Sequence, residues 1–205
     1  MKNTIKYLIL LIIYLVCGVN LQAQNYTFRN VVMSDGLSGL LVNAIYKDSE
    51  GFVWLGTDNC LDRFDGVKVR HYEFRGVDSG RKKRVNCITE TADNQLWVGN
   101  GIGLWRLNRA NGQLERIVPE KIDFAVNTLL PDGDILYIGT EKGLFIQKDG
   151  QLLQVLTDRN MLAACNRIMD LCLNEDKSAL WLATVQGLFS YSLKDGKIDS
   201  WHFQE

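Results

Sequence analysis

Apolar and polar positions alternate in short runs along this chain, and turn-forming residues separate the runs. The clearest example begins with two mostly apolar runs, residues 43–46 and 52–56, which flank a polar turn that ends in Gly51. Alternation over four to six residues between turns is typical of β-strands. Two further runs, residues 61–64 and 67–72, flank an Asp-Gly pair of the kind that closes tight hairpins. This stretch therefore predicts two hairpins, which together make four antiparallel strands.

A signature at the end of the second strand, an aromatic residue followed two positions later by a small one, recurs through the chain. The aromatic residues are Trp54, Trp97, Tyr137 and Trp181, at separations of 43, 40 and 44 residues. A second marker follows each of them by six positions, at Cys60, Gly103, Gly143 and Gly187. Four strands at this period are typical of a β-propeller blade. The sequence therefore predicts an all-β fold, a partial β-propeller of about four four-stranded antiparallel blades, at about residues 37–74, 85–118, 125–156 and 165–203.

The repeated aromatic residues are expected to pack between adjacent blades, because a single blade cannot bury its apolar face alone. The small residue two positions later is expected to let the backbone of a neighbouring blade approach closely. Two further indoles, Trp105 and Trp201, stand outside the repeated pattern. If any indole meets a ligand, we expect it to be one of these two.

The first 23 residues have the features of a secretory signal peptide. Lys2 and Lys6 give a positive start, residues 7–16 form an apolar run, and Ala23 closes a cleavage context. The run is too short for a comfortable membrane span, so we expect a periplasmic location with the repeats in residues 24–205 and no membrane span in the mature chain. Loss of two lysines and no acid takes the formal charge from −1 to −3, which gives no support for nucleic-acid binding.

Cysteine and histidine offer little sign of chemistry. The four cysteines beyond the signal, Cys60, Cys87, Cys165 and Cys172, are even in number and so compatible with a disulfide, but their places in the repeats favour small buried residues. None of the spacings matches a zinc site, and the acidic turns at residues 48–51 and 132–134 are too short for a dedicated calcium loop. The two histidines, His71 and His202, fall on predicted outer strands. We therefore expect no catalytic residue, no metal and no cofactor.

Ligand binding is expected on the face where loops join second to third strands and one blade to the next, because loops on a rigid scaffold commonly carry binding sites. The candidate residues on this loop face are Asp58, Asn59, Arg81, Lys82, Arg84, Asn100, Glu141, Lys142 and Gln186. The run Arg81-Lys82-Lys83-Arg84 is its strongest charge feature, and forked guanidinium donors suit an anionic sugar. A solvated loop is the other interpretation of that run.

Several motifs of the first blade resemble the two-component regulator propeller repeat. They are Asp35 to Ser38, Val42-Asn43, Gly51 to Thr57 and Leu61 to Gly66, and the four copies in register extend the resemblance over nearly all of the mature chain. The departures are Cys60 for glycine, Tyr137 for tryptophan and Ala183 for glycine. The resemblance implies the periplasmic sensor of a hybrid two-component system, in which propellers precede a membrane helix and a histidine kinase. It also implies an oligosaccharide ligand, derived from complex glycans, that controls transcription.

Two alternatives remain open at this point. A secreted propeller enzyme acting on polysaccharide, a lyase or hydrolase, would need convergent catalytic groups on the loop face. A protein-interaction scaffold without a small ligand would need none. The sequence contains no kinase motif, so the chain is expected not to be an enzyme itself.

Residues 26–31 look like a spare strand, yet the fourth blade already has its own outer strand at residues 198–203. We therefore expect the N-terminal part of a longer propeller, or a truncated relative of one, in the form of an open arc. Its partners would be missing propeller blades or other copies that associate through the open blade faces.

Overall fold

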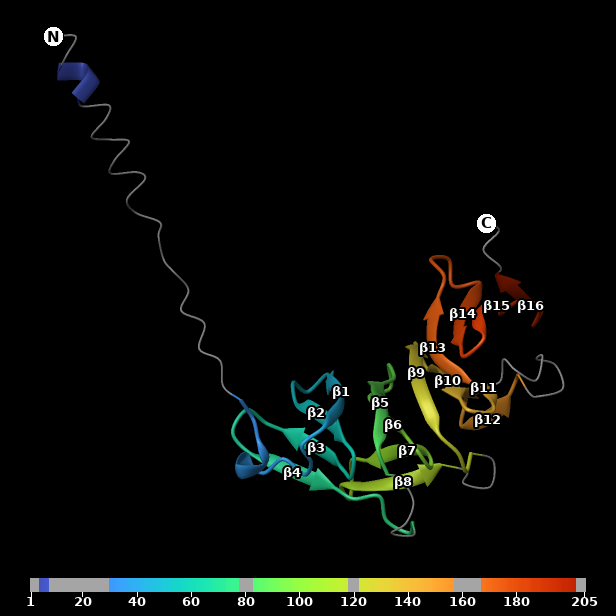
Figure 1. Ribbon diagram of the computed structural model, residues 1–205, viewed down its shortest axis with the longest axis horizontal. Helices are drawn as coiled ribbons and strands as arrows, with labels where there is room; N and C mark the ends of the chain where they lie inside the picture. Colours follow the sequence, from blue (N-terminus) through green and yellow to red (C-terminus); the bar gives the residue numbers. More distant parts are fainter. Residues whose placement is uncertain (1–3, 8–29, 78–82, 118–121, 157–166, 202–205) are drawn as a thin grey trace. The chain divides into compact units, whose positions relative to one another are not determined.

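The computed structural model describes residues 4–7, 30–77, 83–117, 122–156 and 167–201 (Figure 1). The chain divides into two compact units, Met1–Val31 and Val32–Glu205. In the first unit, residues 4–7 are an exposed helical turn, and most of the expected signal peptide lies outside the described residues. Among the residues that are described, no helix is long and apolar enough to cross a membrane.

The second unit contains a short 3₁₀ helix, η1 (Met33–Asp35), followed by four antiparallel sheets of four strands, each in simple chain order (Figure 1). The first sheet holds β1 (Val42–Lys47), β2 (Val53–Thr57), β3 (Leu61–Phe64) and β4 (Val69–Tyr72). The second holds β5 (Val85–Glu90), β6 (Leu96–Asn100), β7 (Gly103–Asn108) and β8 (Gln113–Ile117). The third holds β9 (Val126–Asp132), β10 (Ile135–Thr140), β11 (Gly143–Lys148) and β12 (Gln151–Gln154). The fourth holds β13 (Ile168–Leu173), β14 (Ala179–Thr184), β15 (Gly187–Ser192) and β16 (Ile198–Trp201). This confirms the predicted partial β-propeller of four four-stranded blades.

Local turn chemistry closes the hairpins. Asp65 Oδ1 accepts hydrogen bonds from the backbone N–H groups of Val67 and Lys68, at 2.9 and 2.7 Å. Gly66 then adopts a φ of 97°, a left-handed conformation that costs glycine little because it has no Cβ. The Asp-Gly pair seen in the sequence is therefore a turn between β3 and β4.

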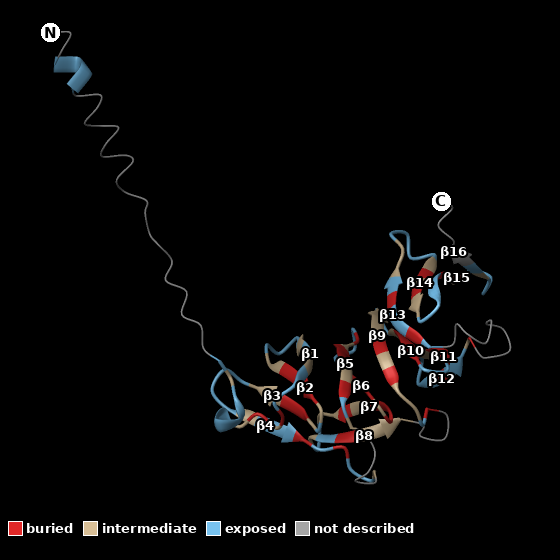
Figure 2. Ribbon diagram, in the orientation of Figure 1, coloured by how far each residue is buried: buried red, intermediate tan, exposed pale blue. Residues whose placement is uncertain are grey.

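Consecutive sheets pack against each other through their first strands: β1 contacts β5, β5 contacts β9, and β9 contacts β13. Three clusters of buried apolar side chains fill the three junctions, and Figure 2 shows buried residues on strands of all four sheets. The second strands β6 and β10 are almost wholly buried. Among the described residues, the extensive contacts between sheets all join consecutive sheets.

The glycine of each aromatic signature makes room for a side chain of the next sheet. A Cβ added to Gly56 would lie 2.4 Å from Val85 Cγ1, and one added to Gly99 would lie 2.6 Å from Val126 Cγ1. Ile168 lies over Gly139 in the same way, 2.8 Å from the added Cβ. The expectation of a close neighbouring backbone was therefore wrong in detail, because a β-branched side chain occupies the space.

Each of these β-branched residues lies at a bulge near the start of a first strand. The pairing register shifts between Val85 and Cys87, and again beside Val126. In the second and third sheets, an asparagine follows the β-branched residue. Asn86 Nδ2 donates to the carbonyl oxygen of Val126 at 2.9 Å, and Asn127 Nδ2 donates to that of Ile168 at 2.8 Å. The bulge thus aims one apolar and one polar contact at neighbouring sheets.

Each repeated aromatic residue is buried where a following sheet packs against it. Trp54, Trp97 and Tyr137 are buried, at 0%, 5% and 4% exposure, each in a junction with the following sheet. Trp181 is only half-buried, so the prediction of four equivalent buried positions was wrong at the fourth, where no following sheet is described. Trp105 is also buried, and its Nε1 donates to Asn100 Oδ1. This contradicts the prediction that the Trp105 indole is available to a ligand. The side chain of Trp201 lies outside the described residues.

Candidate functional site

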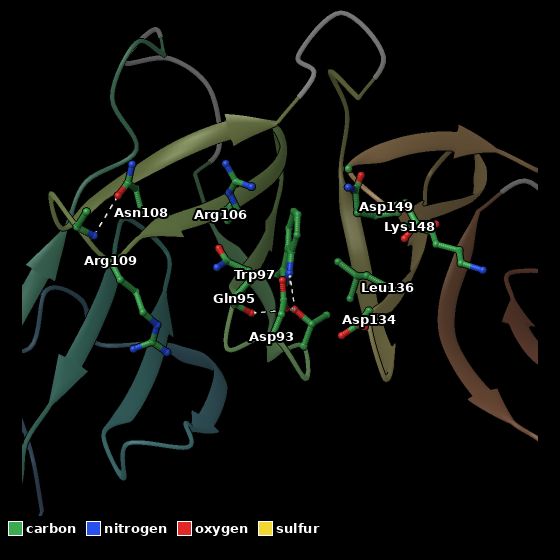
Figure 3. A pocket seen from close by; sticks show the side chains of 14 residues that line it. Asp93, Gln95, Trp97, Arg106, Asn108, Arg109, Asp134, Leu136, Lys148 and Asp149 are labelled. Carbon is green, nitrogen blue, oxygen red and sulfur yellow. Dashed lines mark hydrogen bonds between the residues drawn. The ribbon is translucent and has the colours of Figure 1, made fainter.

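A cavity of about 690 Å³ lies between the second and third sheets (Figure 3). It opens at the end of the sheets where hairpin turns join first to second strands and third to fourth strands. The second sheet contributes Thr91, Asp93, Gln95, Trp97, Arg106, Asn108, Arg109 and Ala110, and the third contributes Asp134, Leu136, Gln147, Lys148, Asp149 and Gly150. This turn-side cavity is therefore on the opposite rim from the loop face.

The indole of Trp97 stands in the middle of the cavity wall, opposite Leu136 (Figure 3). Its Nε1 donates to Thr91 Oγ1 at 3.1 Å, and the Thr91 hydroxyl donates to Asp93 Oδ1 at 2.6 Å. Buried indole N–H groups need such a partner, and the chain of bonds fixes the ring against the turn before β6. Sequence and packing thus build a rigid apolar wall with a carboxylate at its end.

Strands β7 and β8 carry a second hydrogen-bonded group beside the cavity. Glu115 accepts from Asn108 Nδ2 at 2.6 Å and from Arg106 Nη2 at 3.3 Å. These two donors hold the pKa of the Glu115 carboxyl below its ordinary value, with the Asn108 bond as the larger cause. The Arg106 guanidinium lies 6.0 Å from the centre of the Trp97 ring and remains partly exposed toward the cavity.

The junction between the first and second sheets has an ionic bridge at the corresponding level. Arg109 Nη1 lies 2.9 Å from Glu50 Oε1, and its Nη2 lies 2.8 Å from Glu90 Oε1. Counted from the glycine that begins each third strand, the residue equivalent to Arg109 in the third sheet is Asp149. An aspartate cannot bridge to the carboxylates of the second sheet, so this junction lacks the equivalent bridge and holds the cavity instead.

The lining has balanced charge and no obvious nucleophile. Arg106, Arg109 and Lys148 are among the lining residues, together with three aspartates, but the charged ends of Arg109 and Lys148 point away from the cavity (Figure 3). Histidine, cysteine, serine and tyrosine do not occur in the lining, and within the described part of the chain no cluster of His, Cys, Asp or Glu could hold a metal ion. Amides, guanidinium groups and carboxylates around an indole suit a polar ligand.

Two loop-face candidates, Asp58 and Asn100, have structural partners for their side chains. Asp58 Oδ1 accepts from Asn43 Nδ2 at 2.9 Å, while Asn59 is exposed. Asn100 is fully buried, and its Oδ1 accepts from the Ile102 N–H at 3.0 Å and from the Trp105 indole at 3.1 Å. Asn100 was therefore wrongly placed on the open face, because its side chain is buried and accepts a hydrogen bond from the turn between β6 and β7.

The other candidates that the structure describes are exposed on that face. Glu141 and Gln186 point to solvent, and Lys142 Nζ lies 4.7 Å from the centre of the Phe124 ring. Arg84 is exposed, whereas Arg81 and Lys82 lie outside the described residues. The structure brings none of these described residues into the turn-side cavity. The loop face remains a prediction.

His71, on the outer strand β4 of the first sheet, is bonded to a buried carboxylate. Its Nδ1 lies 2.7 Å from Asp62 Oδ1, and Asp62 Oδ2 accepts from both the N–H and the hydroxyl of Ser38, at 2.8 and 2.7 Å. The Ser38 hydroxyl contacts Asp62 rather than the imidazole, so this is no Ser-His-Asp catalytic triad. The group ties the segment before β1 to the first sheet.

The cysteines that the structure describes, Cys60, Cys87 and Cys172, are free thiols, and Cys165 lies outside the described residues. Burial raises the pKa of the Cys87 thiol, which packs beside Gly99. Cys172 is exposed on β13. Of these three, Cys172 is the one classed as exposed.

Comparison with known proteins finds a family model that matches part of the first blade. Residues 36–59 match the family model described as two component regulator propeller. Histidine kinase P4 of Formosa agariphila is 32% identical over 79 residues, which are 38% of this chain and 6% of that protein. The chain thus spans a small part of that relative.

Solved structures extend the similarity over most of the chain. The extracellular domain of one putative hybrid two component system of B. thetaiotaomicron superposes with a TM-score of 0.70 at 21% identity, over 85% of this chain and 26% of that one. A second such domain from B. thetaiotaomicron has a TM-score of 0.63 at 26% identity, over 78% of this chain and 22% of that one. These findings confirm the resemblance to two-component regulator propellers.

Proposed function

We propose that this chain, which carries a two-component regulator propeller repeat, is a periplasmic ligand-sensing segment of a hybrid two-component signalling protein, and that it binds a glycan-derived ligand to control transcription. The observation that carries the proposal is the turn-side cavity, a polar recess with rigid walls on a chain similar to extracellular domains of such systems. Signal output would come from other parts of the signalling protein.

The cavity suits a ligand rich in hydroxyl groups. Its volume of about 690 Å³ is within the range of small-molecule sites in proteins. Gln95 and Gln147 offer amide donors and acceptors from opposite sheets, and Asp134 offers an acceptor from a turn. Sugars present donors and acceptors on adjacent carbons, so amides and carboxylates on two walls can bind them at several points at once.

Binding is favoured over turnover because of what lines the cavity. The side chains that could act as general bases are Asp93, Asp134 and Asp149, and Asp93 already accepts the Thr91 hydroxyl. A lyase or hydrolase needs a positioned acid and base around the reacting bond. Release of products from a glycan panel by the purified chain, abolished by Asp134→Asn, would favour the enzyme instead.

The proposal is tested by calorimetric titration of the purified chain with neutral and acidic oligosaccharides. We expect one group of sugars to bind, and Gln147→Ala to weaken that binding about tenfold, equal to about 1.4 kcal/mol. Glu141→Ala on the loop face is the matched control, since it also removes one polar side chain of the third sheet but does not line the cavity. Loss of binding with the control but not with Gln147→Ala would move the site to the loop face, and no binding to any sugar would refute the glycan ligand.

A further inference from the structure

A second recess, of about 330 Å³, lies between the outermost strands of the first and second sheets. One side is formed by β4 and the residues that follow it, up to Arg75, and the other by the β7–β8 turn at Asn111 and Gly112 with the start of β8. Figure 1 shows the start of β8 beside the end of β4. The described residues that line this outer recess are all different from those of the turn-side cavity, so an inference about it does not rest on the proposed function.

Arg70 reaches across the outer recess from the first sheet to the second. Its Cζ lies 5.2 Å from the centre of the Tyr72 ring, and its Nη2 would lie 3.3 Å from a Cβ added to Gly112. Tyr72 is buried against the Trp54 ring, with 5.1 Å between the ring centres. The guanidinium group is therefore laid over a fixed aromatic side chain, and Gly112, with a φ of 65°, leaves room for it.

The charges of the two arginines in the outer recess are not neutralised by a neighbouring carboxylate. Elsewhere in the second sheet and its connections, Arg106, Arg109 and Arg116 each form an ion pair. Within the described part of the chain, no ion pair joins Arg70 or Arg75 to an acidic side chain. Both guanidinium groups thus keep their N–H donors for another partner.

The carboxylate among the lining residues is that of Glu73, and its charge also acts on a thiol. Burial is the main cause of the raised pKa of Cys60, and the negative charges of Asp62 and Glu73 add to it. Two arginines against one glutamate leave the outer recess with a net charge of +1, which favours an anion with a single charge.

His71 adds a fixed polar group to the same lining. An ionised carboxylate only accepts hydrogen bonds, so the His71 Nδ1 that lies 2.7 Å from Asp62 Oδ1 carries the proton of that bond. Asp62 is itself buried and held by the Ser38 hydroxyl at 2.7 Å. Among the described residues, no partner takes the second ring nitrogen, Nε2, which in the neutral imidazole accepts a hydrogen bond.

The turn side of the outer recess offers a side chain rather than backbone groups. The N–H of Gly112 donates to the Asn108 carbonyl oxygen at 2.8 Å, and that of Gln113 donates to Asn111 Oδ1 at 2.9 Å. These backbone donors are therefore used inside the turn. The amide side chain of Gln113, which is exposed, supplies the donor on this side.

We propose that the outer recess binds a small hydroxy acid, a molecule with one carboxylate and a neighbouring hydroxyl group. Arg70 and Arg75 donate to the carboxylate, for which the planar fork of a guanidinium group is well matched. The hydroxyl group donates to His71 Nε2. The volume is near the lower end of the range for small-molecule sites, which suits a ligand of a few carbon atoms. A phosphate ester has a charge nearer −2 and fits the single positive charge less well.

Nuclear magnetic resonance of the ¹⁵N-labelled full chain tests the proposal, with the backbone N–H resonances of Gly112 and Gln113 as reporters. The probes are glycerate, propionate, which lacks the hydroxyl groups, glycerol, which lacks the charge, and inorganic phosphate. Sodium chloride holds the ionic strength constant, because salt screens exposed charges. We expect glycerate to shift both resonances in a saturable way with a Kd of about 1 mM, and propionate to bind about tenfold more weakly. Phosphate should bind more weakly than glycerate, and glycerol should not bind.

Arg70→Gln should weaken glycerate binding by about tenfold, the effect of one hydrogen bond to a charged group. Arg84→Gln is the matched control, because it removes the same charge from an exposed position that does not line the outer recess. Unchanged resonances elsewhere in the spectrum confirm that each variant is folded.

The site is overturned if glycerate gives no saturable shift of the two reporters, if glycerol binds as well as glycerate, or if Arg84→Gln weakens binding as much as Arg70→Gln. Equal binding of propionate and glycerate would overturn the role of His71. Tighter binding of phosphate than of glycerate would overturn the choice of a carboxylate.

Discussion

Replacing Gly99 with alanine places one methyl group where the second and third sheets meet. The new Cβ would lie 2.5 Å from Cys87 Sγ and 2.6 Å from Val126 Cγ1. Since non-bonded carbons prefer separations of 3.5 to 4.0 Å, both neighbours would have to move by about 1 Å. Val126 is fully buried and anchored by the bond from Asn86 to its carbonyl oxygen, so it has little room to yield. Overpacking of this kind costs about 1 to 3 kcal/mol, and we expect the upper half of that range.

Urea unfolding followed by tryptophan fluorescence measures the cost. With a slope of about 2 kcal/mol per molar urea, a loss of about 2 kcal/mol lowers the midpoint by about 1 M. Ala183→Gly is the control at the equivalent position of the fourth sheet, and it should cost only the about 0.5 to 1 kcal/mol of a glycine in a strand. A Gly99→Ala midpoint within about 0.2 M of wild type would refute the idea that Gly99 makes room for Val126 of the next sheet.

Three further predictions test burial and local electrostatics. Trp97→Ala should lower the free energy of unfolding by about 3 to 5 kcal/mol, whereas Trp181→Ala, at a half-buried position, should cost clearly less; equal losses in urea unfolding would contradict the burial difference. Iodoacetamide at neutral pH should modify exposed Cys172 at least about tenfold faster than Cys87, whose pKa is raised by burial, and peptide mass spectrometry that finds equal rates would argue against the buried thiol. The backbone N–H groups of Lys68 and Val67 lower the folded-state pKa of Asp65. The contribution of Asp65 to stability is therefore present above its unfolded pKa and is lost as pH falls through its folded pKa. A stability difference between wild type and Asp65→Ala that is unchanged from neutral pH to pH 2 would contradict this.

The repeat pattern was sufficient to predict the fold because each blade is specified locally. Turn residues such as Asp65, and the alternation between them, set the four strands of a unit without reference to other units. The period of the aromatic signature then requires that the units stack. Burial of Trp54 and Trp97 follows from stacking alone.

The candidate site could not be predicted in the same way, because it arises where two sheets meet. Arg109 closes one junction, and Asp149 leaves the next one open, but the pairing of each with its neighbour sheet is a tertiary fact. One signal was available in the sequence: the charge reverses between these two positions when the repeats are aligned on Gly103 and Gly143. Trp105, which stands outside the repeated pattern, and Asn100, listed on the loop face, were misjudged for a related reason, since they bond each other inside the second sheet.

Nuclear magnetic resonance of the ¹⁵N-labelled chain tests the central claim, that the turn-side cavity binds a polar ligand. The indole N–H of Trp97 is beside the cavity, bonded to Thr91, whereas that of Trp54 is bonded to Asp48 in the first junction, away from the cavity lining. On titration with an oligosaccharide panel, we expect one ligand class to shift the Trp97 indole resonance and the backbone resonances of Gln95 and Gln147 in a saturable way, with Trp54 unchanged. Saturable shifts confined to Asn59, Glu141 and Gln186, or no saturable shift with any member of the panel, would contradict the account.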